Sequence, residues 1–176
     1  MAHFVLLMKG RSGTGKSTTA RLLARTLAWP LVDKDDIKDE LFQEALSSAG
    51  ESSYEILFGL VERQLDVGLS VVCDSPLSHL RTLNSARDLG IAHDATVLVI
   101  ETLVSDETLW RERIEKRQHD PDAVASGHRI TSWEDLQAGL SKVEQFVIDV
   151  PHLQLDTSKP EAVTTALMWE WLAAQG

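Results

Sequence analysis

The sequence has little cysteine, little basic charge and no long apolar run. A single cysteine, Cys73, excludes an internal disulfide framework and any cysteine-rich zinc site. Lys and Arg number 17 against 27 Asp and Glu, which gives a net charge of -10. Proteins that bind long nucleic acid through its phosphates need a basic surface, so that class of partner is disfavoured. No apolar run reaches membrane-spanning length. We therefore expect a cytoplasmic protein without a membrane segment.

The remaining composition is that of an ordinary globular chain. Of 176 residues, 43% are hydrophobic and 25% are charged, which suits one domain with one sizeable core. The apolar start, residues 1–8, lacks a basic segment and is followed at once by Lys9, so we interpret it as a buried strand and not a signal peptide. No linker or repeat divides the chain. We expect one domain over residues 1–176, as a monomer or a homodimer.

Short apolar runs alternate with longer helical patterns, which indicates a parallel α/β sheet. Strands are predicted at residues 4–8, 31–33, 70–74, 96–101 and 153–155. Helices are predicted at residues 16–28, 37–47, 53–67, 79–89 (closed by Gly90), 106–118, 132–148 and 160–174. Ligands of such sheets bind outside the carboxyl ends of the strands. The residues expected to gather at that edge are Gly10, Asp33, Asp35, Asp74 and Glu101.

A glycine-rich segment follows the first predicted strand and fits the pattern G-x-x-x-x-G-K-[ST] without a gap. Its residues, with the threonine after them, are Gly10, Arg11, Ser12, Gly13, Thr14, Gly15, Lys16, Ser17 and Thr18. The glycines let successive N–H groups face a phosphate, and the following helix presents its positive end. Lys16 suits the β- and γ-phosphates, and Ser17 suits Mg²⁺. A turn without a ligand is the alternative, but the strand and helix context favours ATP or GTP.

An acidic segment, Asp33-Lys34-Asp35-Asp36, follows the second predicted strand. Asp36 suits the N-cap of a helix that begins at Ile37. Helix capping does not account for Asp35, whose carboxylate could accept the proton of a substrate hydroxyl. We therefore predict Asp35 as a general base, and Asp33, Asp36 and Lys38 as residues on the substrate side.

Asp74 ends an apolar strand in the manner of a Walker B acid, which predicts a role toward Mg²⁺ or the substrate hydroxyl. The turn-forming sequence Asp74-Ser75-Pro76 explains the same residue equally well. The loop and helix after it, with Arg81, are expected to face the acceptor.

The segment 106–118 is rich in charge. Arg113 and Arg117 are four residues apart and therefore share a helix face. Like charges at this spacing weaken a helix unless an anion lies between them. Two guanidinium groups brought over the phosphates by a mobile helix would stabilise charge that develops during transfer, so both are predicted to be catalytic.

These motifs together resemble the small P-loop kinases of the polynucleotide kinase, zeta toxin and chloramphenicol phosphotransferase type, which include predicted kinases of the AAA_33 kind. The resemblance rests on 10–17, 35–38, Asp74 and Arg113-x-x-x-Arg117, and it extends to 155–158 and the final helix. It implies a three-layer fold with sheet order 2-3-1-4-5, a lid at about 105–131, and Asp35 as the base. Lys38 stands where several relatives have an arginine, and lysine cannot bind a phosphate bidentately.

Three functions fit these features. The first is a kinase that uses ATP and Mg²⁺ to phosphorylate a hydroxyl of a small molecule, such as an antibiotic or a nucleoside. The second is a kinase for the 5′-hydroxyl of a polynucleotide or nucleotide, which the acidic charge disfavours. The third is a nucleotide-dependent switch or ATPase without a phosphate acceptor.

Overall fold

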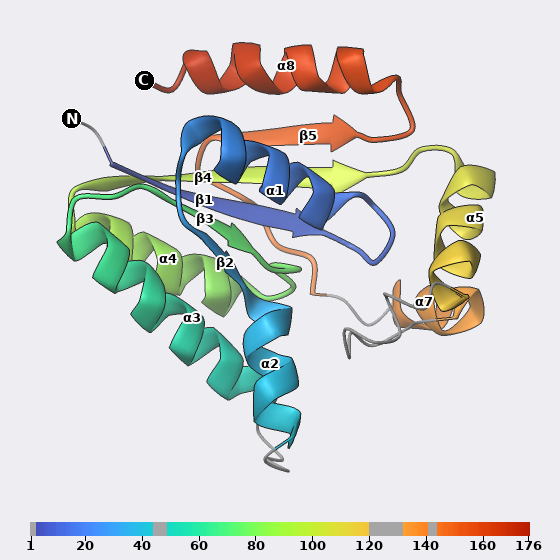
Figure 1. Ribbon diagram of the computed structural model, residues 1–176, viewed down its shortest axis with the longest axis horizontal. Coiled ribbons are helices and arrows are strands. Elements are labelled where there is room, and N and C mark those ends of the chain that lie inside the picture. Colours follow the sequence, from blue (N-terminus) through green and yellow to red (C-terminus); the bar gives the residue numbers. More distant parts are fainter. Residues whose placement is uncertain (1–2, 44–48, 120–131, 141–143) are drawn as a thin grey trace.

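A computed structural model describes residues 3–43, 49–119, 132–140 and 144–176. Its centre is a five-stranded parallel sheet with the order β2-β3-β1-β4-β5 (Figure 1). The strands are β1 (His3–Gly10), β2 (Leu31–Asp33), β3 (Val71–Asp74), β4 (Ala95–Leu103) and β5 (His152–Asp156). The predicted sheet order is therefore confirmed.

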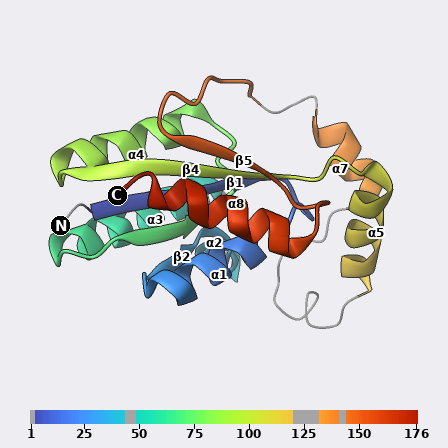
Figure 2. The same ribbon diagram turned by 90° about the horizontal axis from the view of Figure 1, so that it is seen from above.

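Helices cover both faces of the sheet, which makes three layers (Figure 2). The helices are α1 (Lys16–Leu27), α2 (Lys34–Gln43), α3 (Ala49–Asp66), α4 (Leu80–Ala92), α5 (Glu107–Gln118), α7 (Trp133–Leu140) and α8 (Glu161–Ala173). Packing with α1 and α8 buries one face of the sheet, and packing with α3 and α4 buries the other. No helix among the described residues is long and apolar enough to cross a membrane.

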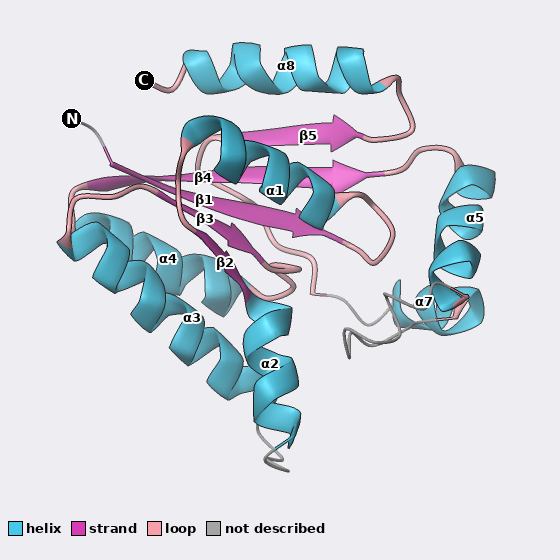
Figure 3. Ribbon diagram, viewed as in Figure 1, coloured by secondary structure: helices cyan, strands magenta, loops and turns pink. Residues whose placement is uncertain are grey.

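The central strand β1 shows why an unbroken apolar run was needed. Val5, Leu6, Leu7 and Met8 are each at most 1% exposed. Alternate side chains of a strand point to opposite faces, so Val5 and Leu7 enter the core beside α3 and α4, and Leu6 and Met8 enter the core beside α1 and α8. All five strands end on the same side of the molecule, where α5 and α7 lie (Figure 3).

Several predicted helix boundaries are wrong, among them those of α4 and α7. Gly90 does not close α4, because the helix continues to Ala92. A Cβ at Gly90 would lie 2.7 Å from the carbonyl oxygen of Ala95, so glycine is required there for close packing between α4 and the start of β4. The predicted helix over 132–148 is only partly present: α7 ends at Leu140, 141–143 lie outside the described residues, and 144–148 are not helical.

Candidate functional site

The glycine-rich loop connects β1 to α1 at the carboxyl edge of the sheet. Gly13 and Gly15 adopt φ angles of 77° and 83°, which side chains other than glycine rarely adopt. A Cβ at Gly10 would lie 2.5 Å from Thr102 Oγ1 and 2.7 Å from Thr14 Oγ1. The loop therefore lies so close to the end of β4 that its first position has no room for a side chain.

Helix α5 contacts the middle of this loop directly. The indole Nε1–H of Trp110 donates a hydrogen bond of 2.8 Å to the carbonyl oxygen of Ser12. A Cβ at Gly13 would lie 2.8 Å from Ile114 Cδ1, one helical turn further along α5. Trp110 in turn meets the ring of Trp133 on α7 edge to face, with ring centroids 5.5 Å apart. The loop peptide at residues 12–13 is thus held by a small apolar unit made of α5 and α7.

The far end of the loop is held through Thr157, which follows β5. The hydroxyl of Thr157 donates to the carbonyl oxygen of Thr14 at 2.9 Å. Arg113 donates to the hydroxyl and the carbonyl oxygen of the same threonine at 2.8 and 2.7 Å. The guanidinium of Arg113 is therefore engaged by the protein itself, and this contact explains how α5 tolerates two arginines four residues apart.

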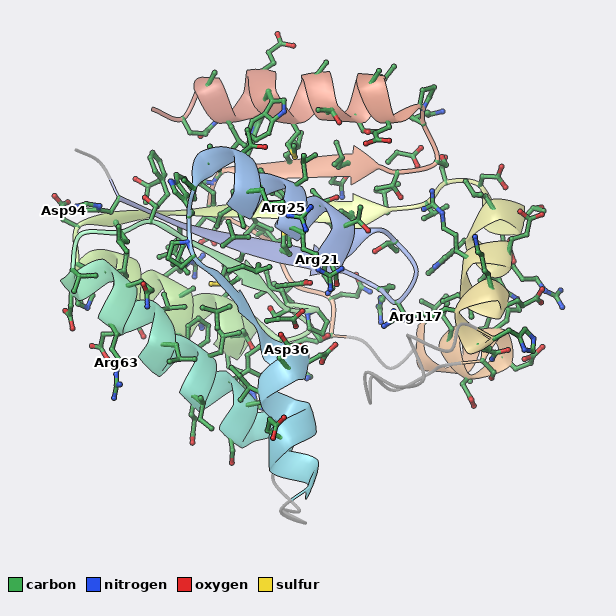
Figure 4. The ribbon with its side chains drawn as sticks, viewed as in Figure 1. Arg21, Arg25, Asp36, Arg63, Asp94 and Arg117 are labelled. Carbon is green, nitrogen blue, oxygen red and sulfur yellow. The ribbon has the colours of Figure 1, made fainter. Side chains whose placement is uncertain are left out.

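The second arginine of α5 is placed differently. The side chain of Arg117 is half-buried, and among the described residues its guanidinium forms no hydrogen bond or ion pair. Figure 4 shows Arg117 on the side of α5 that faces the sheet. The structure thus separates two arginines that the sequence pattern treats alike.

Lys16 and Asp74 bring the start of α1 and the end of β3 together. Lys16 Nζ lies 2.5 Å from Asp74 Oδ1, and the Asp74 side chain is 1% exposed. The second oxygen of this carboxylate, Oδ2, is buried and has no hydrogen-bond partner among the described residues. A buried carboxylate oxygen without a hydrogen-bond donor, close to a glycine-rich loop, fits a site for a divalent cation. Ser17, which follows Lys16 in sequence, would supply a hydroxyl ligand to the same cation.

The end of β2 adds a further carboxylate. Asp33 is the register partner of Asp74 in the neighbouring strand. Burial, followed by the charge of Asp74, raises the pKa of Asp33 to about 6. Its Oδ1 accepts a hydrogen bond of 2.9 Å from the backbone N–H of Asp35. This is the contact of an N-cap, and α2 begins at Lys34.

The predicted capping role of Asp36 is therefore wrong. The helix starts three residues earlier than expected because Asp33, the last residue of β2, already accepts a hydrogen bond from a backbone N–H group of the first turn. Asp36 lies within that turn and is exposed (Figure 4).

Asp35, at the start of α2, is more exposed than Asp74. Its side chain is 43% exposed, and its Oδ1 lies 3.2 Å from Nζ of the nearly buried Lys34. Lys34 is held in turn over the ring of Tyr54 at 5.3 Å from the centroid. The chain thus places a cation beside Asp35, whose side chain is partly exposed to solvent.

The other predicted residues lie around this edge. Arg81 is exposed in the first turn of α4, and Thr18 is exposed in the first turn of α1. Lys38 belongs to α2, but its side chain lies outside the described residues, as does the second part of the expected lid, 120–131. Glu101 also reaches the edge, where it pairs with Lys9.

Sequence reasoning missed the residues of β4 and α5 that support the loop through hydrogen bonds. Thr102 contacts Thr14 through a hydroxyl–hydroxyl bond of 2.8 Å, and Trp110 binds Ser12. Both lie about a hundred residues from the loop in sequence, so no local pattern reveals them. The only available signal for Trp110 was its position one turn before Ile114 on the arginine-bearing helix.

The sheet order, the loop between β1 and α1, and the ion pair of Lys16 with Asp74 define a P-loop nucleotide-binding fold. Comparison with known families narrows this class. The AAA_33 family, described as an AAA domain, matches residues 5–143, and the chain belongs to this family. No curated protein matches the chain.

Solved structures agree on the fold. A predicted kinase of Chloroflexus aurantiacus is 21% identical with a TM-score of 0.74, covering 96% of this chain and 98% of that one. A sugar kinase of Janibacter is 17% identical with a TM-score of 0.70, over 98% and 95%. The APS kinase of Mycobacterium tuberculosis, solved with AMPPNP and APS, is 16% identical with a TM-score of 0.66, over 98% and 99%. These likenesses confirm the fold of the small P-loop kinases.

Proposed function

We propose that this protein is an ATP-dependent kinase that transfers the γ-phosphate to a hydroxyl group of a small molecule. The observation that carries the proposal is the group of acids beside the loop. Asp74 contacts Lys16, Asp33 adjoins Asp74 across the sheet, and Asp35 follows at the start of α2. Binding a nucleotide with its metal needs one such acid. The other two acids at this edge, Asp33 and Asp35, suit the binding and deprotonation of an acceptor hydroxyl.

The chain's own residues fit ATP and Mg²⁺. The loop backbone from Gly10 to Gly15 would hold the phosphates, with Lys16 against the β- and γ-phosphates. Ser17 and the open oxygen of Asp74 would hold the metal ion. When bound, ATP with Mg²⁺ supplies the phosphoryl group and neutralises charge on it.

Asp35 would accept the proton of the acceptor hydroxyl. Its side chain is 43% exposed, and Nζ of Lys34 lies 3.2 Å from one of its oxygens. Asp33 fixes the Asp35 backbone through the capping hydrogen bond, so the base lies on a defined turn of α2 and not on a loose loop. Asp36, Lys38 and Arg81 would border the acceptor.

The two arginines of α5 would have different roles. Arg117 has no partner among the described residues and would meet charge that develops on the transferred group. Arg113 is bound to Thr157, which supports the loop carbonyl of Thr14, so we assign it a positioning role.

Proteins of similar fold support a small acceptor, since a sugar kinase and an APS kinase are among them. The test is a screen of hydroxylated metabolites, nucleosides and antibiotics for acceptor-dependent ADP formation, with the product identified by a mass increase of one phosphoryl group. A labelled 5′-hydroxyl oligonucleotide is included in the same screen. Phosphorylation of the oligonucleotide in preference to every small molecule would contradict the proposal. ATP hydrolysis that no acceptor stimulates would favour a switch or ATPase.

A further inference from the structure

A pocket lies beside the phosphate loop, and the roles proposed so far do not use its side chains. It is bordered by the first residues of the loop, by the segment after β3 at 76–78, by the end of β4 at 101–104, and by Trp110. The loop and the segment after β3 are joined where the N–H of Gly10 donates to the carbonyl oxygen of Pro76 at 3.5 Å. That segment begins two residues after Asp74, the partner of Lys16. The pocket therefore adjoins the place where phosphate would be transferred.

Two charged residues of the pocket neutralise each other. Lys9 forms an ion pair with Glu101 Oε1, and the other oxygen of Glu101 accepts a hydrogen bond of 3.0 Å from Gln154 Nε2. His152 Nε2 lies 3.2 Å from that same oxygen. Burial alone would raise the pKa of Glu101, but the hydrogen bonds from Lys9 and Gln154 outweigh it, so the pKa is lowered. The pocket thus contains a fixed, ionised carboxylate with a fixed ammonium beside it.

Arg11 is the third charge and has no such partner. It belongs to the loop and is one of the residues that line the pocket. Among the described residues its guanidinium forms no hydrogen bond or ion pair. Burial lowers the pKa of Arg11, against the opposing effect of the Glu101 charge. Because Glu101 is already paired with Lys9, this partly desolvated guanidinium has only a shared counter-charge, and a bound anion would stabilise it.

The sum of charges identifies the ligand class. Lys9 and Glu101 cancel, so Arg11 leaves this pocket with one net positive charge in a protein of net charge -10. We propose that the pocket binds the phosphate acceptor and that Arg11 binds a carboxylate on it, so that the substrate is a small hydroxylated acid. This inference rests on the proposed kinase function.

The chemistry of the pocket favours a carboxylate over a phosphate group. A guanidinium and a carboxylate are both planar and form paired hydrogen bonds. The two negative charges of a phosphate group would exceed the single net positive charge of the pocket. They would also repel the triphosphate of an ATP bound to the same loop more strongly than one carboxylate would. Glu101 can accept hydrogen bonds from hydroxyl groups, and Lys9 can donate hydrogen bonds to them. The ion pair of Lys9 and Glu101 therefore suits the hydroxyl-bearing part of such an acid.

The experiment compares acceptors in matched sets: a sugar acid or hydroxy acid, the uncharged sugar or alcohol of the same carbon skeleton, and its phosphate ester. ADP formation is measured for the wild type, for Arg11→Gln, for Arg11→Lys, and for Arg63→Gln on α3 as a control far from the pocket (Figure 4). We expect transfer to acids in preference to their uncharged partners. Arg11→Gln should raise KM for the acid at least tenfold, Arg11→Lys should restore part of the loss, and KM for ATP should change less than twofold.

The outcomes separate this inference from the function on which it rests. Equal or better transfer to the uncharged partners, or to the phosphate esters, would overturn the acid specificity and leave the kinase proposal standing. A rise in KM for ATP as large as that for the acid in Arg11→Gln would instead place this side chain on the nucleotide and would also overturn the inference. Absence of transfer to every member of every set would count against both proposals.

Discussion

The two sides of the candidate site are built in opposite ways. On the nucleotide side, the loop is supported at its middle and at its far end by hydrogen bonds from distant elements: Trp110 binds Ser12, and Thr157 binds Thr14. On the acid side, carboxylates are gathered with few cations, and the pKa of Asp33 rises to about 6. The first arrangement favours stability and a fixed shape, whereas the second costs stability.

This contrast indicates where the chemistry lies. A loop that binds phosphates through its backbone works best when its shape is set before the ligand arrives. Acids held close together remain costly unless a metal ion or a proton-transfer role makes use of them. The acid side is therefore where function is expected to oppose stability, and substitutions on the two sides should have effects of opposite sign on folding.

The largest effect is expected at the residue that joins the two sides. Lys16→Met removes the cation for the phosphates and leaves Asp74 buried without its partner. Phosphate transfer should fall about 100-fold or more, and the thermal unfolding temperature should also fall. Turnover with the acceptor found by the screen, and calorimetry without ligand, are the two measurements. A variant with unchanged turnover would contradict the role of Lys16.

A smaller loss is expected when the loop loses its support. Trp110→Phe removes the hydrogen bond to the Ser12 carbonyl but keeps an aromatic ring against Trp133. ATP affinity should fall about five- to tenfold, corresponding to about 1 kcal/mol for one hydrogen bond.

The matched control for this substitution is Trp171→Phe on α8, a partly buried residue that packs against the core away from the loop. Titration with a fluorescent ATP analogue measures both variants. An equal loss of affinity in Trp171→Phe would attribute the effect to general destabilisation and would remove the positioning role of Trp110.

Thr157→Val tests the support of the far end of the loop, at Thr14. The substitution keeps the shape of the side chain but removes the hydroxyl that donates to Thr14 and accepts from Arg113. KM for ATP should rise about threefold with little change in kcat, because the effect is on loop shape and not on the transferred group. A drop in kcat with constant KM would instead show that Arg113 acts on the reaction.

The smallest and opposite effect is expected at Asp33. Its pKa is about 6 in the folded protein against an ordinary value of 3.8, so the folded state binds more protons between these values and stability falls as pH rises through them. Asp33→Asn keeps an oxygen to cap α2 but removes the charge. The variant should be more stable than the wild type by about 1 kcal/mol above pH 6, after allowance for partial exposure.

The gain should be mostly lost by about pH 4, because the folded state is then protonated and the unfolded state, with its ordinary pKa of 3.8, has begun to take up the proton. Chemical denaturation at pH 8 and pH 4 measures it. A variant that is less stable than the wild type at pH 8 would show that the carboxylate pair is not under electrostatic strain.

Sequence reasoning succeeds where the signal is local or periodic. The apolar run of β1 and the loop motif after it were sufficient to predict a parallel sheet with a glycine-rich turn at its carboxyl edge, and the resemblance to small P-loop kinases supplied the sheet order. It failed at boundaries set by contacts that are not local. Asp33 caps α2 because the strand runs into the helix without a loop, and Gly90 stays within α4 because β4 packs against it.

The candidate site shows the same limit. The pattern correctly predicted that Asp74 lies near the phosphate loop, since the loop and Asp74 both follow the carboxyl ends of parallel strands, and its contact with Lys16 agrees with this. It could not distinguish Arg113 from Arg117, because the difference is made by Thr157, more than forty residues away in sequence. Trp110 and Arg11 have roles that depend on what they face, and residue type alone does not give that.

Asp35→Asn tests most directly the claim that the acid side makes this nucleotide-binding protein a kinase. The substitution removes the proton-accepting charge while leaving the α2 backbone and its cap at Asp33 in place. ATP affinity should change less than about threefold, and acceptor-dependent ADP formation should fall about 100-fold or more. Full transfer activity in a variant that still binds ATP would contradict the account.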